Sequence, residues 1–334
     1  MKITFIGGGS VQWTPKLVTD MALTETLADA ELVLHDIDTN ALDLLTRVCT
    51  KIVAQAEANM QVEATLDRAG ALQNADFVIL CVAIGRLPAM RNDLEIPERY
   101  GINQSVGDTV GPGGLARGLR HIPFAAQVAR EMEQLCPHAW LINLTNPMTT
   151  ICRAVTHATS IRTVGLCHEV TGVRCRLGEI LDVPETTIEL EVAGINHLPV
   201  ISNFRIGKED GMPMLNAWLA EHGPLKFIDE HMPGIRDIFH DRLGVKLTLF
   251  QQLGVLFGAG DRHVAEFLAG FLTEASGRGR HYGLVLTTIA HREALAQQRR
   301  AKLEEFLNGV LGDLQMSDEQ LAPVIAALAG GGGR

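Results

Sequence analysis

Three side chains that can do chemistry stand together at residues 167–169, Cys-His-Glu, directly after a short apolar stretch. A second histidine, His197, ends the sequence Gly-Ile-Asn-His, and a further group, Gly-Asp-Arg-His, occupies residues 260–263. A thiolate and an imidazole brought together hold a divalent ion while leaving positions open for substrate oxygens. Singly, such residues are more often a packing cysteine or a satisfied core histidine, so it is their combination that favours a site.

A carboxamide, Asn146, follows another short apolar run, in the sequence Thr-Asn-Pro. Ligands of parallel α/β sheets bind beyond the carboxyl ends of the strands, and both this run and the one before Cys167 end in polar groups. Asn146 is therefore predicted to hold a substrate hydroxyl or the ribose next to a nicotinamide. The alternative is a turn-forming asparagine before a proline.

The first apolar run, Lys2–Ile6, leads into three glycines and a serine. Glycines allow a tight turn and a close approach of the backbone to pyrophosphate, and a following helix presents its free N–H groups to the anion. Gly7, Gly9 and Ser10 are therefore predicted to bind a dinucleotide. The fingerprint is incomplete, because Gln12 stands where a third glycine is expected, and an ordinary glycine turn is the alternative.

A carboxylate stands at the end of the second apolar run, at the usual distance for accepting hydrogen bonds from the ribose hydroxyls. Asp36 fits this role best, and Asp38 is the alternative. An acid here repels a 2′-phosphate, so the predicted cofactor is NAD rather than NADP. The competing interpretation makes Asp36 a turn residue or a helix N-cap, a role that Asp38 or Thr39 also suits.

The elements that position these residues follow from an alternation of short aliphatic runs and longer amphipathic ones. Strands are expected at Lys2–Ile6, Glu31–Leu34, Asp76–Val82, Trp140–Leu144 and Thr163–Leu166. Helices are expected at Pro15–Leu27, Asn40–Asn59 and Ile122–Leu135. The alternation predicts an α/β fold with an N-terminal Rossmann domain, built on a doubly wound parallel sheet with right-handed crossovers.

After Glu169 the pattern changes to a mixture of antiparallel strands and helices. Strands are expected at Thr187–Val192 and Leu198–Ile206, and helices at Pro213–Glu221, Val264–Glu274 and Arg292–Leu311. This mixture indicates an α+β C-terminal domain. We therefore place an NAD-binding domain at 1–170 and a substrate and metal domain at 171–334, with a boundary defined to about ten residues.

The composition is that of a folded two-domain protein of 334 residues, with 46% hydrophobic and 20% charged residues. The 29 basic and 39 acidic residues give a formal charge of −10, which repels phosphate backbones and anionic lipid. Neither nucleic acid nor a membrane is therefore an expected partner. Six cysteines without a CxxC pair, and a beginning without a signal peptide, indicate a reducing, cytoplasmic location.

Taken together, the motifs resemble glycoside hydrolase family 4, the NAD- and metal-dependent glycosidases. The matching stretches, in the family's order, are residues 3–10, 36–38, 107–109, 111–114, 145–147, 165–169, 194–197 and 260–263. The resemblance implies a fold similar to that of lactate and malate dehydrogenases, and an enzyme that hydrolyses α-glycosides.

Carried over residue by residue, the resemblance makes Cys167 and His197 the metal ligands, usually for Mn²⁺, and Asn146 a substrate contact. A cysteine followed by a histidine is similar to family members that act on unphosphorylated α-glycosides, namely α-glucosidases, α-galactosidases and α-uronidases. His168 then occupies the place of the general acid. The sugar stays open among glucose, galactose and uronic acids.

The resemblance also implies a redox route to hydrolysis. NAD⁺ takes a hydride from C3 of the sugar, the C2 proton then leaves with help from the metal, the C1–O bond breaks by elimination, water adds and the hydride returns. Asp261 is the expected base, since neither of the two tyrosines lies where many relatives carry a tyrosine base. A salt bridge to Arg262, or a helix N-cap before Val264, is the alternative for Asp261. Arg262 is expected to bind sugar hydroxyls or a uronate carboxylate, and His263 to assist or to face solvent.

Family members are usually longer than this chain, so a compact or truncated form is expected. The family also implies a homodimer or homotetramer and a small carbohydrate as the binding partner. Two rival functions remain: an NAD-dependent 2-hydroxyacid or polyol dehydrogenase, which forms net NADH and needs no metal, and an inactive truncated NAD-binding relative. Cys167 beside His168 disfavours the dehydrogenase, because such enzymes pair an aspartate with a histidine and carry no thiolate ligand.

Overall fold

The computed structural model describes residues 1–224, 238, 240–309, 314–317 and 319–330. The chain forms two compact units, each assembled from separate stretches. The first unit comprises Met1–Arg86, Gly118–Cys167 and Arg292–Arg334, and the second comprises Leu87–Arg117 and His168–His291. None of the helices in the described ranges is long and apolar enough to cross a bilayer.

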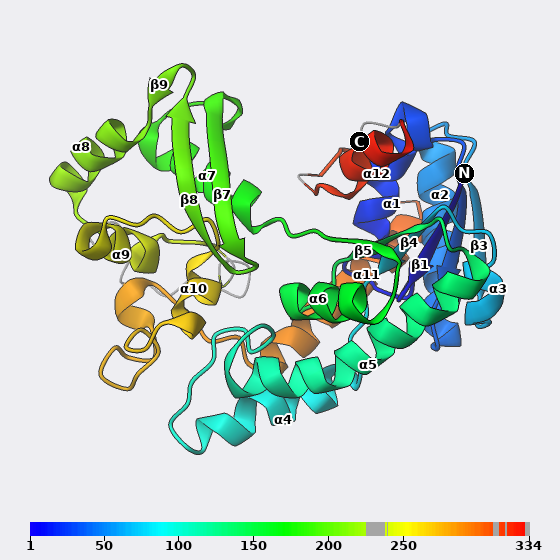
Figure 1. The fold of residues 1–334 in the computed structure, drawn as a ribbon, viewed down its shortest axis with the longest axis horizontal. Coiled ribbons are helices and arrows are strands. Elements are labelled where there is room, and N and C mark those ends of the chain that lie inside the picture. Colours follow the sequence, from blue (N-terminus) through cyan, green and yellow to red (C-terminus); the bar gives the residue numbers. More distant parts are fainter. Residues whose placement is uncertain (225–237, 239, 310–313, 318, 331–334) are drawn as a thin grey trace. The chain divides into compact units, whose positions relative to one another are not determined.

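A six-stranded parallel sheet forms the centre of the first unit (Figure 1). The strands are β1 (Lys2–Ile6), β2 (Glu31–His35), β3 (Gln61–Thr65), β4 (Phe77–Leu80), β5 (Trp140–Asn143) and β6 (Arg162–Gly165). Their order, β3-β2-β1-β4-β5-β6, is the doubly wound arrangement, and it confirms the predicted Rossmann fold. All four residues of β4 are buried, as a parallel strand covered on both faces requires.

Strand β3 is missing from the sequence prediction. Its residues lie at the edge of the sheet and are exposed or half-buried. An edge strand needs no continuous apolar run, so the pattern that identifies the central strands is absent there.

Helices connect the strands of the first unit. They are α1 (Thr14–Ala22), α2 (Thr39–Gln55), α3 (Arg68–Leu72) and α6 (Met148–Ala158), with the 3₁₀ helix η1 (Glu25–Leu27). Helix α12 (Leu321–Ala329) follows the last strand and contacts α1. Three further helices, α4 (Arg86–Glu98), α5 (Gly111–Leu135) and α11 (Ile289–Leu307), contain residues of both units.

Helix α5 begins at Gly111 rather than at the predicted Ile122. Its first turn reads Gly-Pro-Gly-Gly, a sequence of poor helix propensity, which is why the start was not predicted. Small residues are required here, because a Cβ at Gly114 would collide with the backbone of Thr109. The start of α5 thus packs closely on the loop before it.

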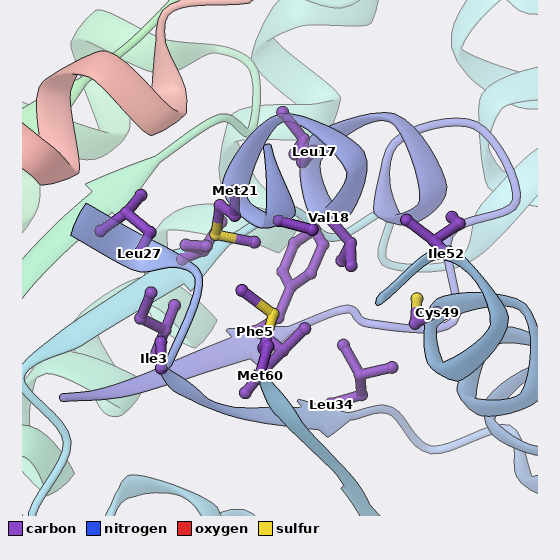
Figure 2. Packing of buried hydrophobic residues seen from close by; sticks show 14 of the residues in the cluster. Ile3, Phe5, Leu17, Val18, Met21, Leu27, Leu34, Cys49, Ile52 and Met60 are labelled. Carbon is purple, nitrogen blue, oxygen red and sulfur yellow. The ribbon is translucent and has the colours of Figure 1, made fainter. Parts of the chain in front are cut away.

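One hydrophobic core of the first unit lies between the sheet and helices α1 and α2 (Figure 2). A second core joins residues of the sheet, such as Val78 and Leu80, to residues of α5, such as Val128. Phe5 of β1 is fully buried and extends toward Val18 and Met21 of α1. Leu34 of β2 and Ile52 of α2 belong to the same cluster. Burial of these side chains fixes the carboxyl ends of β1 and β2, where a dinucleotide binds in folds of this kind.

A three-stranded antiparallel sheet and short helices form the second unit. The strands, in spatial order, are β7 (Ile188–Ile195), β8 (Leu198–Ile206) and β9 (Glu209–Asp210). The helices are α7 (Glu169–Leu181), α8 (Met212–His222), α9 (Gly244–Leu253) and α10 (Asp261–Phe267), with the 3₁₀ helices η2 (Glu185–Thr187) and η4 (Arg280–Tyr282). The mixture of strands and helices confirms the predicted α+β character of the C-terminal half.

Helix α10 is displaced from the predicted helix Val264–Glu274. It begins at Asp261, so that His263 and Glu266 lie on it, and it ends at Phe267. Gly270 adopts φ +106°, a conformation outside the helical region, so the chain does not continue as a helix through this residue.

The two compact units interleave along the chain. The predicted domain boundary near residue 170 lies close to the passage from the first unit to the second between Cys167 and His168. Two segments differ from the predicted division at residue 170. Leu87–Arg117 precedes residue 170 but belongs to the second unit, and Arg292–Arg334 follows residue 170 but belongs to the first unit. The division into domains 1–170 and 171–334 stays a prediction, because compact packing is not a test of independent folding.

A tight glycine turn follows β1. The N–H groups of Gly7 and Gly8 both donate to the carbonyl oxygen of His35, each at 2.9 Å, which ties the turn to the end of β2. Gly7 adopts φ +94°, and a Cβ at this position would collide with the carbonyl oxygen of Cys81. Only glycine satisfies both the conformation and the close approach.

We predict that Gly7→Ala destabilises the protein more than Gly101→Ala. Gly101 also has a positive φ, +76°, but a Cβ there meets no atom of the described structure within 4 Å. Gly101→Ala therefore costs only the left-handed backbone strain, about 1–2 kcal/mol, whereas Gly7→Ala adds about 1–3 kcal/mol for the collision. Urea denaturation followed by circular dichroism measures both values, and equal losses of stability would contradict the packing described for Gly7.

Candidate active site

The glycine turn and the predicted ribose-binding carboxylate meet at the ends of β1 and β2. Oδ2 of Asp36 accepts a hydrogen bond from Gly9 N at 3.1 Å, and Oδ1 accepts from Ile37 N at 2.8 Å and Asp38 N at 3.1 Å. Ser10 closes the turn, because its Oγ accepts from Trp13 N at 3.2 Å. The structure thus brings together the glycine turn and the carboxylate that the sequence singles out.

Asp38 is the N-cap of α2, which is one of the roles that the sequence allowed for it. Its Oδ1 accepts from the backbone N–H groups of Asn40 and Ala41, each at 3.1 Å, so Asp38 is the N-cap of α2. Its Oδ2 pairs with Arg86 at 3.0 Å. Bonding to Ala41 N and Arg86 lowers the pKa of Asp38. Because Asp38 caps the helix, Asp36 is not required for that purpose.

The chain at Asn146 is held at the carboxyl edge of the sheet. Oγ1 of Thr145 accepts from Val82 N at 3.0 Å and donates to Leu80 O at 3.2 Å, which joins β4 to the end of β5. The side chain of Asn143 binds the backbone N–H and carbonyl of Thr145, both at 3.0 Å. Asn146, which is half-buried, follows this clamp directly. Its position suits a ligand contact at the edge where ligands of such sheets bind.

Within the second unit, Asp108, His197 and His263 form a cluster of metal-ligating groups. One ligand atom from each lies within 4.8 Å of the other two. Asp108 comes from the loop before α5, His197 from the turn between β7 and β8, and His263 from α10. Imidazole and carboxylate are ligands that suit Mn²⁺ and related divalent ions.

The donor set of this cluster fits a cation. Nδ1 of His263 is buried and has no hydrogen-bond partner in the described part of the chain, which leaves a polar atom for a ligand to satisfy. The rings of His197 and His263 stack with their centroids 3.7 Å apart and an interplanar angle of 26°. Two stacked imidazoles carrying two positive charges would repel each other, so the pair is suited to a neutral, ligating form.

The electrostatics put His197 and Asp108 in the protonation states that bind a metal. Burial, together with the nearby His263, lowers the pKa of His197 to about 4. Burial alone would raise the pKa of Asp108, but His263, His197 and Arg117 outweigh it and hold the pKa well below its usual range. At neutral pH His197 is therefore neutral and Asp108 is ionised.

Glu169 contacts His263 of the cluster and also His168. Its Oε2 accepts from Gly260 N at 2.6 Å, and its Oε1 lies 3.6 Å from Nε2 of both His263 and His168. Burial opposes ionisation of Glu169, but the surrounding histidines lower its pKa to about 2. His168 precedes α7 and its side chain is 41% exposed, so it is accessible for the predicted role of general acid, which stays a prediction.

Asp261 is engaged in contacts that the sequence did not indicate. Its Oδ2 accepts from Val245 N at 2.8 Å, and its Oδ1 accepts from Lys246 N at 3.0 Å and Lys246 Nζ at 2.9 Å. The carboxylate thus satisfies the N-terminal N–H groups of α9 from outside that helix. The cation that it pairs with is Lys246 rather than Arg262, and Lys246 also pairs with Asp241.

Burial and the neighbouring Asp241 raise the pKa of Asp261 to about 6. This is close to the range that a general base needs at neutral pH. The hydrogen bonds, however, occupy both oxygens of a side chain that is only 1% exposed. The same carboxylate therefore has a clear structural role, and its role as the base stays a prediction.

Arg262 is directed at the protein itself. Its Nη2 donates to Ser105 O at 3.1 Å and to Oγ1 of Thr287, and burial lowers its pKa. These contacts join α10 to the loop that carries Asp108. Binding of sugar hydroxyls or a uronate by Arg262 stays a prediction, and the contacts of the described structure favour a structural role.

Cys167 and His197 belong to different units, so their pairing around one ion stays a prediction. All six cysteines lie within the described residues and none forms a disulfide, so the thiol of Cys167 is available in reduced form. His263, expected either to assist or to face solvent, belongs to the cluster and its side chain is only 14% exposed.

No role is predictable from the sequence for Asp108, Thr109 or Lys246. Asp108 and Thr109 lie in the stretch 107–109 that carried the resemblance, and that was the only signal for them. Lys246 stands in an apolar segment, Val-Lys-Leu, where a lysine is unexpected unless a buried counter-charge is present. Of its two partner carboxylates, Asp241 is five positions away, but Asp261 is 15 positions away, and no local pattern identifies that pair.

Comparisons with known proteins show what the chain as a whole is similar to. The family model described as family 4 glycosyl hydrolase matches residues 2–183. An α-galacturonidase from Thermoanaerobacterium saccharolyticum is 34% identical over 327 residues, which cover 92% of this chain and 68% of the relative. A solved Bacillus subtilis structure, named as a glucosidase, superposes with a TM-score of 0.88 at 32% identity, over 98% of this chain and 76% of that one.

A 6-phospho-α-glucosidase from gut microorganisms, solved in complex with NAD and Mn²⁺, shares the fold at lower identity. Its TM-score is 0.79 at 20% identity, and the match covers 98% of this chain and 74% of that one. At this identity the likeness extends to the fold alone.

We predict that Lys246→Met strongly destabilises the second unit. The substitution keeps the apolar stem but leaves Asp241 and Asp261 without their buried cation, and breaking such a pair costs about 3–5 kcal/mol. The matched control is Lys302→Met on the exposed surface of α11, expected to change stability by less than about 0.5 kcal/mol. Denaturant unfolding measures both, and equal stability of the two variants would refute the buried ion-pair network.

Proposed function

The chain belongs to the family 4 glycosyl hydrolases, and we propose that it hydrolyses unphosphorylated α-glycosides, with α-galacturonides as the first substrates to test. The observation that carries the proposal is the cluster of Asp108, His197 and His263, a cation-binding donor set in a glycosidase. The relative named as an α-galacturonidase, which matches over most of the chain, supports the choice of sugar.

The charge states of the cluster favour a metal-assisted route over a pair of carboxylates. A conventional glycosidase keeps one carboxylic acid protonated near neutral pH so that it can protonate the leaving oxygen. Here two carboxylates beside the histidines, Asp108 and Glu169, have lowered pKa values, whereas burial raises the pKa of Glu266, whose Oε1 is occupied by the N–H groups of Val106 and Gly107. Ionised groups of this kind suit cation binding and suit a general acid poorly.

We propose that Gly7, Gly9, Ser10 and Asp36 bind NAD. The glycine turn lies at the end of β1 directly before helix α1, and Asp36 stands at the end of β2, where a ribose binds in this fold. We propose that Mn²⁺ is held by His197 and Cys167, with Asp108 and His263 as further ligating groups close to His197. Bound in this way, NAD and Mn²⁺ supply a hydride acceptor and a Lewis acid.

The chain's own residues then orient the sugar and move protons. Asn146 binds a sugar hydroxyl at the sheet edge, and Arg262 is retained as a contact for hydroxyls or a uronate. His168, exposed beside Glu169, donates a proton to the leaving oxygen. Asp261 removes the C2 proton once C3 has been oxidised; its raised pKa supports this role, and its bonds to α9 oppose it.

The sugar undergoes oxidation and reduction within one turnover. Loss of hydride from C3 gives a ketone, which acidifies the proton on C2. Loss of that proton and cleavage of the C1–O bond release the aglycone, and addition of water followed by return of the hydride gives the free sugar. With NAD bound, the hydride would return to the sugar within each turnover, so no net NADH would form. A dehydrogenase on the same fold would instead accumulate NADH in proportion to substrate.

The assembly and the location are part of the same proposal. The family resemblance implies a homodimer or homotetramer, and six thiols without a disulfide support a reducing, cytoplasmic compartment. Sedimentation velocity of the purified chain tests the assembly, and a monomer at micromolar concentration would count against it.

We predict that p-nitrophenyl α-galacturonide is hydrolysed in the presence of NAD⁺, Mn²⁺ and a reductant, more efficiently than the corresponding α-glucoside and α-galactoside. Cys167→Ala should reduce kcat/KM by at least about 100-fold, since a metal ion supplies several kcal/mol of transition-state stabilisation. Cys175→Ala, which removes a half-buried thiol from α7, is the matched control and should retain activity.

The same reaction in D₂O adds a direct test of the route. Deuterium should appear at C2 of the released sugar, detected by NMR or mass spectrometry. Hydrolysis without exchange at C2 would rule out the elimination route. Stoichiometric NADH without aglycone release would identify the dehydrogenase, and NAD binding without either would identify a non-catalytic relative.

A further inference from the structure

A hydroxyl group links two members of the metal-ligating cluster. Oγ1 of Thr109 lies 2.7 Å from Oδ1 of Asp108, to which it donates, and 2.7 Å from Nδ1 of His197. A hydroxyl carries a single proton, and an ionised carboxylate only accepts hydrogen bonds. With that proton directed at Asp108, the second bond requires His197 to donate from Nδ1 to the threonine oxygen.

We propose that Thr109 is a positioning residue that fixes His197 as the tautomer with its proton on Nδ1, so that Nε2 presents the lone pair that binds a divalent cation. The inference rests on the proposed function in taking His197 as a metal ligand. Metal-ligating histidines commonly have the proton of their second nitrogen held by an oxygen acceptor, which sets both tautomer and ring orientation.

The reverse direction of the hydrogen bonds is unfavourable. If Thr109 donated to His197 Nδ1, its oxygen and Oδ1 of Asp108 would face each other at 2.7 Å as two acceptors without a proton between them. Only a protonated Asp108 would relieve this repulsion, and a protonated carboxyl group is a poor ligand for a cation. The order of donors therefore runs from His197 through Thr109 to Asp108.

The loop that carries Thr109 is anchored to α10. Oε1 of Glu266 accepts from Val106 N at 2.6 Å and from Gly107 N at 2.8 Å. Gly107 adopts φ +71°, and a Cβ there would collide with the side chain of Leu94. Because Glu266 lies on the same short helix as His263, the loop and the second imidazole are held by one element.

Burial and stacking restrict the orientation of the His197 ring. His197 is only 2% exposed and stacks on His263, so exchanging the two ring nitrogens requires the ring to turn within a packed site. The hydroxyl of Thr109 therefore meets one nitrogen, Nδ1. This restriction is what allows one hydrogen bond to determine which nitrogen faces a cation.

We test the proposal with Thr109→Val and Thr109→Ser. Valine keeps the shape but removes the hydroxyl, so Nδ1 of His197 loses its acceptor and both tautomers become accessible. Removal of such an outer partner reduces metal affinity by about 10- to 100-fold. Serine keeps the hydroxyl and should bind Mn²⁺ within about three-fold of the wild-type protein. The control is Thr248→Val, which removes a threonine hydrogen bond to Gly244 O in α9 and should leave Mn²⁺ affinity unchanged.

Mn²⁺ binding to the full chain is measured by electron paramagnetic resonance of the free ion, with no sugar substrate present. Weak binding by Thr109→Val with near-normal binding by Thr109→Ser supports the proposal. Equal binding by the wild type and Thr109→Val overturns it, as does an equal loss in both variants, because keeping the hydroxyl in Thr109→Ser would then fail to preserve Mn²⁺ binding.

A second measurement does not depend on a metal or on the stability of the variants. Long-range ¹H–¹⁵N correlation spectra of the metal-free wild-type protein report the tautomer of His197, with the signal assigned from its absence in His197→Asn. The proposal predicts a protonated Nδ1 and an unprotonated Nε2. A proton on Nε2 would refute it, whereas wild-type protein with the predicted tautomer but no Mn²⁺ binding would refute the proposed metal function instead.

Discussion

The mutual approach of one carboxylate and two imidazoles is the constraint on which the site depends. Asp108, His197 and His263 place ligand atoms within 4.8 Å of one another, and lone pairs at such distances repel unless a proton or a cation lies between them. Thr109 supplies one proton between two of the groups, and Nδ1 of His263 is still without a partner in the described structure. The arrangement therefore suits a cation, and the residues of helix α10 and of the 105–109 loop are held together by the bonds of Glu266 to the loop.

The fold was largely predictable because its central strands carry continuous apolar runs. The residues of β1, β4 and β5 are almost all buried. Glycines follow β1, and polar residues follow β5, as is typical of the carboxyl edge of a parallel sheet. The glycine turn and Asp36 were predictable for the same reason, since both occupy fixed positions after such strands. The edge strand β3 and the glycine-rich start of α5 were not predictable, because their local sequences favour neither element.

Much of the site was beyond local sequence patterns. The bond between Thr109 and His197 joins residues 88 positions apart, and the contact of Asp261 with Lys246 spans 15 positions across two helices. A salt bridge between the neighbours Asp261 and Arg262 was one expectation from the sequence. In the structure Asp261 instead bonds to Lys246, and Arg262 donates to Ser105 O. Chemistry-bearing residues were identified by type and order, but their partners depend on tertiary packing.

The cation site is tested most directly by crystals grown with Mn²⁺ and NAD⁺ and measured at the manganese absorption edge. The account predicts an anomalous peak within coordination distance of Nε2 of His197, with Nδ1 of the same ring bonded to Thr109, and with the thiolate of Cys167 as a further ligand. An anomalous map with no peak beside His197, or with the ion bound through its Nδ1 after displacement of Thr109, would contradict it.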